Sequence, residues 1–180
     1  NTTASCNTAV GFYALEYNTT GFENVAVGNK ALNTNTTGKW NTAVGMNALF
    51  SATVANGNTA LGFCTLHLTV AAAGNAAFGA HAMRSNTTGP NNTASGYTSM
   101  SSNTTGGFNS ASGYRTLLNN TTGSYNTATG AYALQGVGST ASYNTAYGAC
   151  AQHGNTTGTQ NIASGYKALL TNTTGNSNVA

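Results

Sequence analysis

An internal period constrains this chain more than any other feature. Asparagine recurs every 17 residues, apart from one interval of 18 residues between Asn126 and Asn144. Self-similarity at a short, fixed period is typical of solenoids and fibres, in which each repeat packs on its neighbours. We therefore interpret residues 1–180 as one domain of about ten coils, part of a longer or assembled fibre, with one repeat per coil. The repeats begin at Asn7, Asn24, Asn41, Asn58, Asn75, Asn92, Asn109, Asn126, Asn144, Asn161 and Asn178.

Within each repeat, the same residue types recur at the same places. We number positions from the leading asparagine, which is position 0; position 2 is then always alanine and position 4 always glycine. Position 8 is leucine or methionine in nine of ten repeats, and Gln152 is the exception. If equivalent residues stack about 4.8 Å apart, positions 0, 2 and 8 form ladders along a rod. The predicted leucine ladder contains Leu15, Leu32, Leu49, Leu66, Leu117, Leu134 and Leu169.

The breakers in each repeat exclude helix. Glycine at position 4 and an NTTG motif at positions 11–14 leave no helix-forming segment of useful length. The sequence predicts an all-β fold, a parallel β-solenoid or β-roll, with short strands at positions 1–3 and roughly 5–10. We expect glycine at position 4 either where the chain bends with positive φ or where a Cβ has no room, and the corner glycine to have positive φ. We expect the leading asparagine to tolerate left-handed backbone. We also expect the leading asparagines to hydrogen-bond amide to amide along the rod.

Three corners depart from the regular pattern. The corner motif is replaced before Asn58 and Asn75, and the corner before Asn144 carries the extra residue. We expect bulges or a changed cross-section at these three corners.

Position 3 is apolar from Val10 to Phe78 and mostly hydroxylated in later repeats. Either the first half packs against a partner, or the repeats have simply drifted.

The pattern N-[TSV]-A-x-G-x-x-A-L followed by NTTG resembles two groups of fibre repeats. It is similar to the head of trimeric autotransporter adhesins, a left-handed parallel β-roll of shorter period. It resembles more closely the repeat region of phage-type tail-fibre and surface proteins that end in an endosialidase-type chaperone. The NTAVG segments at Asn7 and Asn41, and NTALG at Asn58, carry this likeness. The resemblance implies an assembled extracellular fibre without catalysis in this segment.

The sparse charges argue against enzymes, nucleic-acid binding and membrane spans. Charged residues are 4% of the chain, against about 25% in an ordinary soluble domain. The five cations are scattered over different repeats, and no apolar run approaches the ~20 residues of a membrane span. Glu16 and Glu23 are the only carboxylates, and they form no acid/base pair. We expect no enzyme activity and no cofactor.

One weak metal site is suggested by the cysteines and histidines. Cys64 and His67 form a C-x-x-H unit, and His81 occupies the position of Cys64 in the next repeat. The three side chains would suit zinc if a bend brought them to one side of the coil. On a straight strand, positions 6 and 9 face opposite sides, so we expect no metal there. The cysteines are too far apart in the stack to pair with one another, which leaves free thiols or links between chains.

The NTT triplets are also sequons for N-glycosylation. A turn explains them equally well, because asparagine and threonine bond nearby backbone and glycine completes the corner. The candidate acceptors are Asn18, Asn35, Asn86, Asn103, Asn120, Asn155 and Asn172.

The period and the likeness lead to one functional expectation and one alternative. The expectation is a structural fibre, shaft or adhesin segment on a cell or virion surface. Its partners would be copies of itself, in a trimer or an end-to-end filament, and a cell-surface glycan or host receptor. The alternative is an ice-binding or carbohydrate-binding β-solenoid that displays threonine and asparagine ladders.

Overall fold

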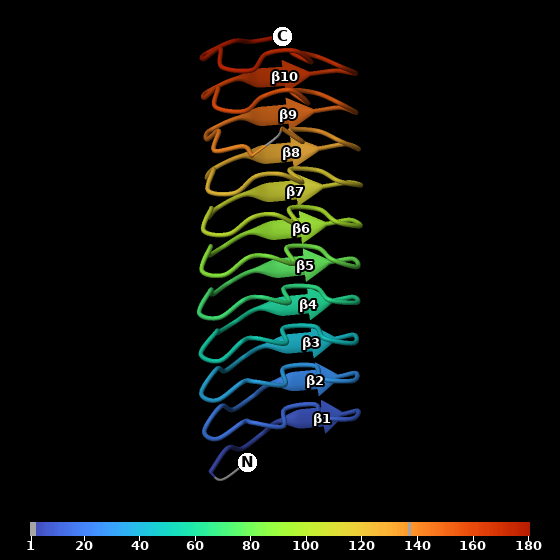
Figure 1. Cartoon of the computed structure of the whole chain (residues 1–180), viewed down its shortest axis with the longest axis vertical. Coiled ribbons are helices and arrows are strands. Elements are labelled where there is room, and N and C mark those ends of the chain that lie inside the picture. Colours follow the sequence, from blue (N-terminus) through green and yellow to red (C-terminus); the bar gives the residue numbers. More distant parts are fainter. Residues whose placement is uncertain (1–2, 137) are drawn as a thin grey trace.

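The computed structural model describes residues 3–136 and 138–180 as a rod of stacked coils (Figure 1). The described residues form ten three-residue strands, contain no helix, and make an all-β parallel β-solenoid. The strands are β1 (Thr8–Val10), β2 (Val25–Val27), β3 (Thr42–Val44), β4 (Thr59–Leu61), β5 (Ala76–Phe78), β6 (Thr93–Ser95), β7 (Ser110–Ser112), β8 (Thr127–Thr129), β9 (Thr145–Tyr147) and β10 (Ile162–Ser164).

The strands pair in sequence order to form one parallel sheet along the rod. Each strand pairs with the equivalent residues of the next coil, so that Ala94 lies opposite Ala111 and Ala111 opposite Ala128. The predicted arrangement of one repeat per coil, with like residues over like, is confirmed. Position 2 points inward, because alanines from Ala26 to Ala163 are buried there, whereas positions 1 and 3 face outward.

The core is a narrow column between the sheet and the opposite wall of each coil. The ladder at position 8 fills this column, and the side chains from Leu32 through Leu134 are almost wholly buried. Alanines at positions 2 and 7 pack beside the ladder. Gln152 is also buried, and its Nε2 donates to the carbonyls of Thr145 and Asn161 at 2.8 and 3.1 Å. The amide is therefore satisfied where other coils place an alkyl chain.

The predicted second strand, at positions 5–10, is wrong. That stretch is a run of turns in which positions 6 and 8 have positive φ, for example 61° at Tyr132 and 48° at Leu134. Bonds between coils nevertheless continue there: Leu117 N donates to Ala133 O at 3.0 Å, and Arg115 N donates to Tyr97 O at 3.1 Å. Left-handed backbone costs a non-glycine residue about 1–2 kcal/mol. These bonds between coils, repeated along the rod, hold the chain in that conformation.

The expectations for glycine and asparagine are only partly confirmed. Glycine at position 4 has positive φ, and a Cβ on Gly28 would lie 2.7 Å from the carbonyl carbon of Gly45. The corner glycine at position 14 lacks positive φ, and so do the leading asparagines. Position 16 has it instead, as at Tyr125 with φ of 60°. The corner glycine is required by space, because a Cβ on Gly106 would overlap the carbonyl oxygen of Gly123.

The irregular corners differ in how they depart from the regular path. In the coils before Asn58 and Asn75, position 16 is glycine, and the corners are joined by an isolated bridge between Asn56 and Ala73. The longer coil keeps register on both sides of its extra residue: Gly136 N donates to His153 O, and Thr140 N donates to Thr156 O. The register is therefore regained by Ser139, and residue 137 lies outside the described residues.

Candidate functional site

The leading asparagines form a ladder inside the rod, as predicted. Asn109 shows the geometry: its backbone N and its Nδ2 both donate to Asn92 Oδ1, at 2.9 and 3.1 Å. Its Nδ2 also donates to the carbonyl of Gly123, the corner glycine of the same coil, at 2.9 Å. Each amide thus ties its coil to the previous one and closes its own corner. The buried members are Asn24, Asn41, Asn58, Asn75, Asn92, Asn109, Asn126, Asn144 and Asn161.

A second asparagine ladder, at position 11, was missed by the sequence analysis. Asn103 Nδ2 donates to Asn86 Oδ1 at 2.8 Å, and Asn120 Nδ2 donates to Asn103 Oδ1 at 2.9 Å. Both ladders converge on the corner carbonyl, because Gly123 O accepts from Asn109 and from Asn120. The NTTG motif is therefore an internal clamp as well as a turn.

This placement argues against glycosylation at most of the sequons. The asparagines at the regular corners are buried and use Nδ2, the atom that a glycan would occupy, as an internal donor. A glycan on that nitrogen would have to lie inside the coil. Asn172 alone among the candidates is half-buried, and its Nδ2 also donates, to Gly175 O at 3.0 Å. The other candidates are Asn18, Asn35, Asn86, Asn103, Asn120 and Asn155.

The second ladder is interrupted where the corner sequence changes. Asn35 Oδ1 and Asn120 Oδ1 are buried without a hydrogen-bond partner. Asn35 lies below Ala52, which occupies the next position 11 and is itself fully buried. An unpaired buried acceptor is destabilising, because the oxygen gave up its water on folding. The missing donor above Asn35 Oδ1 therefore lowers the stability of the rod at that coil.

Ala52→Asn should repair this gap. The new amide would donate to Asn35 Oδ1, as Asn35 Nδ2 donates to Asn18 Oδ1 at 2.8 Å. We expect the free energy of unfolding to rise by about 1 kcal/mol, measured by urea titration followed by circular dichroism. Ala52→Leu is the control, since it adds comparable bulk without a donor. Equal or lower stability of the asparagine variant relative to the leucine variant would contradict the ladder argument.

The weak metal candidates do not assemble into a site. Within the described residues, no group of three His, Cys, Asp or Glu side chains is arranged to hold a metal ion. His67 stacks on Phe50, with ring centroids 5.2 Å apart, and its Nδ1 lies 3.3 Å from Asn47 O. His81 lies edge-on to Phe63 at 5.1 Å, and Cys64 is buried beside Asn47. Among the described cysteines, Cys6, Cys64 and Cys150 are free thiols.

The surroundings of His81 lower its pKa and so link folding stability to pH. Burial lowers the pKa of His81 below its ordinary value of 6.5, and the nearby charges of Arg84 and His67 lower it further. The unfolded chain therefore binds this proton more readily than the folded chain, and folding stability should fall as the pH drops below about 6.5. Urea titrations at about pH 7.5 and pH 5 test this expectation. His81→Asn should show a smaller loss, since Asn47 holds the same position at φ 57°. An unchanged loss would exclude His81 as its source.

The two carboxylates make local hydrogen bonds in the first coils. Glu16 Oε2 accepts from Asn33 Nδ2 at 2.9 Å, and Glu23 Oε2 accepts from Trp40 Nε1 at 2.6 Å. Each is thus paired with a side chain of the next coil.

A small open depression of about 210 Å³ lies beside the longer coil and is lined by Asn119, Gln135, Gly136, His153, Gly154 and Thr156.

The outer face of the sheet has two halves of different character. Position 3 is apolar in β1–β5 and is hydroxylated in β6–β8. Most of these apolar side chains are exposed, as are Ser95 and Ser112 in the second half. Position 3 thus faces outward in both halves, and the change occurs between β5 and β6. The apolar members are Val10, Val27, Val44, Leu61 and Phe78.

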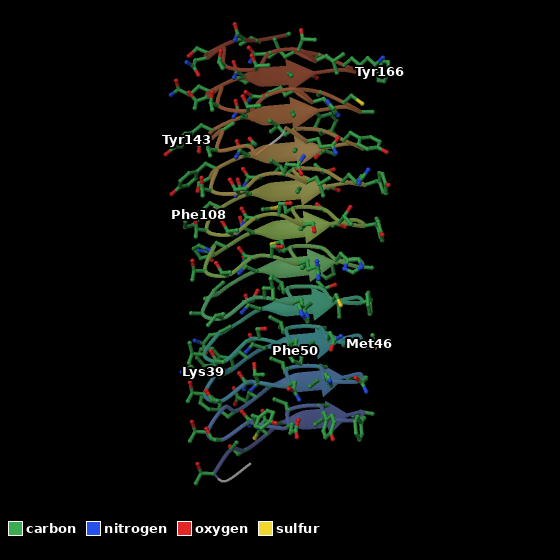
Figure 2. All side chains as sticks on the ribbon, in the orientation of Figure 1. Lys39, Met46, Phe50, Phe108, Tyr143 and Tyr166 are labelled. Carbon is green, nitrogen blue, oxygen red and sulfur yellow. The ribbon has the colours of Figure 1, made fainter. Side chains whose placement is uncertain are left out.

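Two edges of the rod carry most of the aromatic residues. Figure 2 places Met46 and Tyr166, both at position 5, on one edge, and Lys39, Phe108 and Tyr143, at positions 15 and 16, on the other. We call the first the aromatic edge, comprising positions 5 and 6 of the coils from Phe63 to Lys167, together with Arg84, which lies near His81. We call the second the corner edge. On the corner edge, Phe108, Tyr125 and Tyr143 stack face to face, with centroids 5.0 and 5.1 Å apart.

Comparison with known proteins adds no family to this fold. No protein-family model, curated protein or solved structure matches the chain. In the part of the chain that the structure describes, no helix is long and apolar enough to cross a membrane. The structure thus establishes a β-solenoid repeat protein.

Proposed function

We propose that this chain is a segment of an extracellular structural fibre or shaft that assembles with copies of itself. The observation that supports it best is the continuity of bonding between coils. The parallel sheet runs through β1–β10, and the leading asparagine of each coil bonds its predecessor from Asn7 to Asn178. Repeated bonds around every coil make a rod that resists bending and proteolysis, whereas a catalytic function would need a cluster of reactive groups.

Self-assembly would occur through the edge strands of the sheet. The free edges are β1 at one end and residues 178–180 at the other, because Val179 bridges Ile162 and so covers the edge of β10. A free edge readily pairs with another chain. A copy that continued the stack would extend both the sheet and the asparagine ladder. Its partners would thus be copies of this chain, with a host receptor or cell-surface glycan bound along the side of the fibre.

Light scattering of the purified chain over a range of concentrations tests assembly. We expect elongated particles whose mass rises in multiples of 18.1 kDa. Ala9→Lys should reduce assembly, because Ala9 is exposed in β1 but occupies the position of the buried Ala26, and a copy stacked on β1 would bury the charge. Thr8→Lys is the matched control on the outward face of the same strand. A chain that stays monomeric at high concentration, or equal inhibition by both variants, would overturn the proposal.

The alternative ice-binding or carbohydrate-binding function now rests on a smaller surface. The asparagine ladders are largely buried, and the first threonine of the NTT triplets from Asn18 to Asn155 donates to the next coil, as Thr104 does to Thr121 O at 2.9 Å. A hydroxylated patch on the outward face of β6, β7 and β8 favours the alternative. Thermal hysteresis measurements test it for ice, and a glycan array tests it for carbohydrate. The patch comprises Thr93, Ser95, Ser110, Ser112, Thr127 and Thr129.

A further inference from the structure

The aromatic edge is a continuous column of rings. His81 links Phe63, at 5.1 Å, to Tyr97, at 6.1 Å. Tyr97 stacks on Tyr114 at 5.9 Å, and Tyr114 meets Tyr132 at 5.3 Å. Phe63, Tyr97 and Tyr114 are each about half exposed, with 42%, 52% and 43% of their surface accessible. The column therefore presents ring edges and phenol hydroxyls to solvent along several coils.

Cations lie along the same edge, and no carboxylate accompanies them. Arg115 lies over the Tyr114 ring at 5.8 Å, and Lys167 over the Tyr166 ring at 5.0 Å. Arg84 is exposed and close enough to His81 to lower its pKa. Arg115 Nε is buried without a hydrogen-bond partner. The two carboxylates of the sequence, at residues 16 and 23, belong to the first repeat, so this edge keeps its positive charge.

We infer that the aromatic edge binds a linear acidic polysaccharide whose carboxylates meet Arg84, Arg115 and Lys167 while its sugar rings lie along the tyrosine column. The charges are complementary, and complementary potentials select and orient a partner. Tyrosine suits such a ligand, because its hydroxyl can hydrogen-bond the hydroxyls of a sugar while the exposed edge of its ring makes apolar contact. This site does not depend on self-assembly, since it lies on the side of the rod.

The spacing of the cations favours a sparsely charged polymer over nucleic acid. Arg84 and Arg115 lie two coils apart, about 10 Å along the rod, and Lys167 lies three coils further, about 14 Å. A nucleic-acid strand carries a phosphate about every 3.4 Å. Tyr97 and Tyr114 also stack on one another with planes 9° apart, so each covers a face of the other. Few faces are thus free to stack on bases, which is how proteins hold single strands.

Affinity electrophoresis of the purified chain through gels that contain polygalacturonate tests the inference. Retardation should exceed that in dextran gels and should decline with added salt, because screening weakens exposed charge pairs. The triple variant Arg84→Gln, Arg115→Gln, Lys167→Gln should bind about tenfold more weakly, given about twofold for each exposed pair. Circular dichroism checks that the variant remains folded.

Single variants on opposite edges give the matched comparison. Arg84→Gln should weaken retardation about twofold, whereas Lys39→Gln, which removes one charge from the corner edge, should leave it unchanged. Arg84 is exposed, so its variant should fold even if the triple variant does not. Equal loss from both single variants, no retardation by polygalacturonate, or stronger binding to poly(dT) would overturn the inference. Failure to self-assemble would not affect any of these readings.

Discussion

Gly96→Ala should destabilise the rod by about 3–5 kcal/mol, the largest effect we expect from adding one methyl group to this chain. Gly96 has φ of 138°, a conformation that residues with a Cβ rarely adopt. The added Cβ would also lie 2.7 Å from the carbonyl carbon of Gly113 and would overlap its oxygen. The carbonyl group of Gly113 belongs to a backbone that is held by hydrogen bonds between coils, so it cannot move without breaking the stack. Urea titration followed by circular dichroism measures the loss.

Gly57 provides the control for this variant. It also has positive φ, 63°, but a Cβ there would meet no atom within 4 Å. Gly57→Ala should therefore cost only about 1–2 kcal/mol, the price of left-handed backbone alone. Gly57→Asn should cost less, since Asn91 occupies the equivalent position with φ of 54°. If Gly96→Ala were no worse than Gly57→Ala, close packing of neighbouring coils at position 4 would not be what requires glycine.

The contrast between these glycines shows which parts of the fold could be predicted from the sequence. The period predicted one coil per repeat, and alanine at position 2 and leucine at position 8 predicted the core. Glycine at position 4 predicted a close approach. These residues recur because their sites depend on size or on backbone freedom, and both properties can be read from the residue type.

The left-handed positions could not be predicted in the same way. Leu117 and Arg115 have φ of 50° and 55°, yet neither residue type favours that conformation. Bonds to neighbouring coils impose it, so the cause lies outside the segment that adopts it. The strand predicted at positions 5–10 was wrong for this reason: an extended chain and this turning chain both offer their N–H and C=O groups to adjacent coils.

The second asparagine ladder could have been predicted from the sequence. Asn occupies position 11 in seven of ten repeats, and the chain contains no aspartate at any position. An exposed turn would accept Asp as readily as Asn. A buried amide must both donate and accept, as Asn103 does between Asn86 and Asn120, and a carboxylate cannot donate. Absence of aspartate from a chain rich in turns therefore indicates internal amides. The outer edges left no comparable signal, because their side chains vary from coil to coil.

Asn109→Ala should cost about 3–4 kcal/mol, the second largest effect that we expect. Asn109 Oδ1 accepts the backbone N of Asn126 at 2.9 Å, and this buried N–H would lose its partner. The bonds from Asn109 Nδ2 to Asn92 and to Gly123 O would also be lost. Asn29→Ala is the matched control, since Asn29 is exposed. It should change stability by less than about 0.5 kcal/mol, and equal losses in the two variants would exclude the ladder as a source of stability.

Asn109→Asp separates loss of the donor from loss of shape. The substitution keeps an oxygen for Asn126 N but turns a second oxygen toward Asn92 Oδ1 and Gly123 O, the two acceptors that Nδ2 served. At neutral pH a buried carboxylate facing two acceptors should be at least as destabilising as alanine. Protonation restores one donor, so the free energy of unfolding should rise, relative to Asn109→Ala, as the pH falls toward 4. Urea titrations of both variants across that range measure the difference. If the difference in the free energy of unfolding between the two variants did not change with pH, water would reach the site. The stacked amides would then contribute packing and no directional hydrogen bonds.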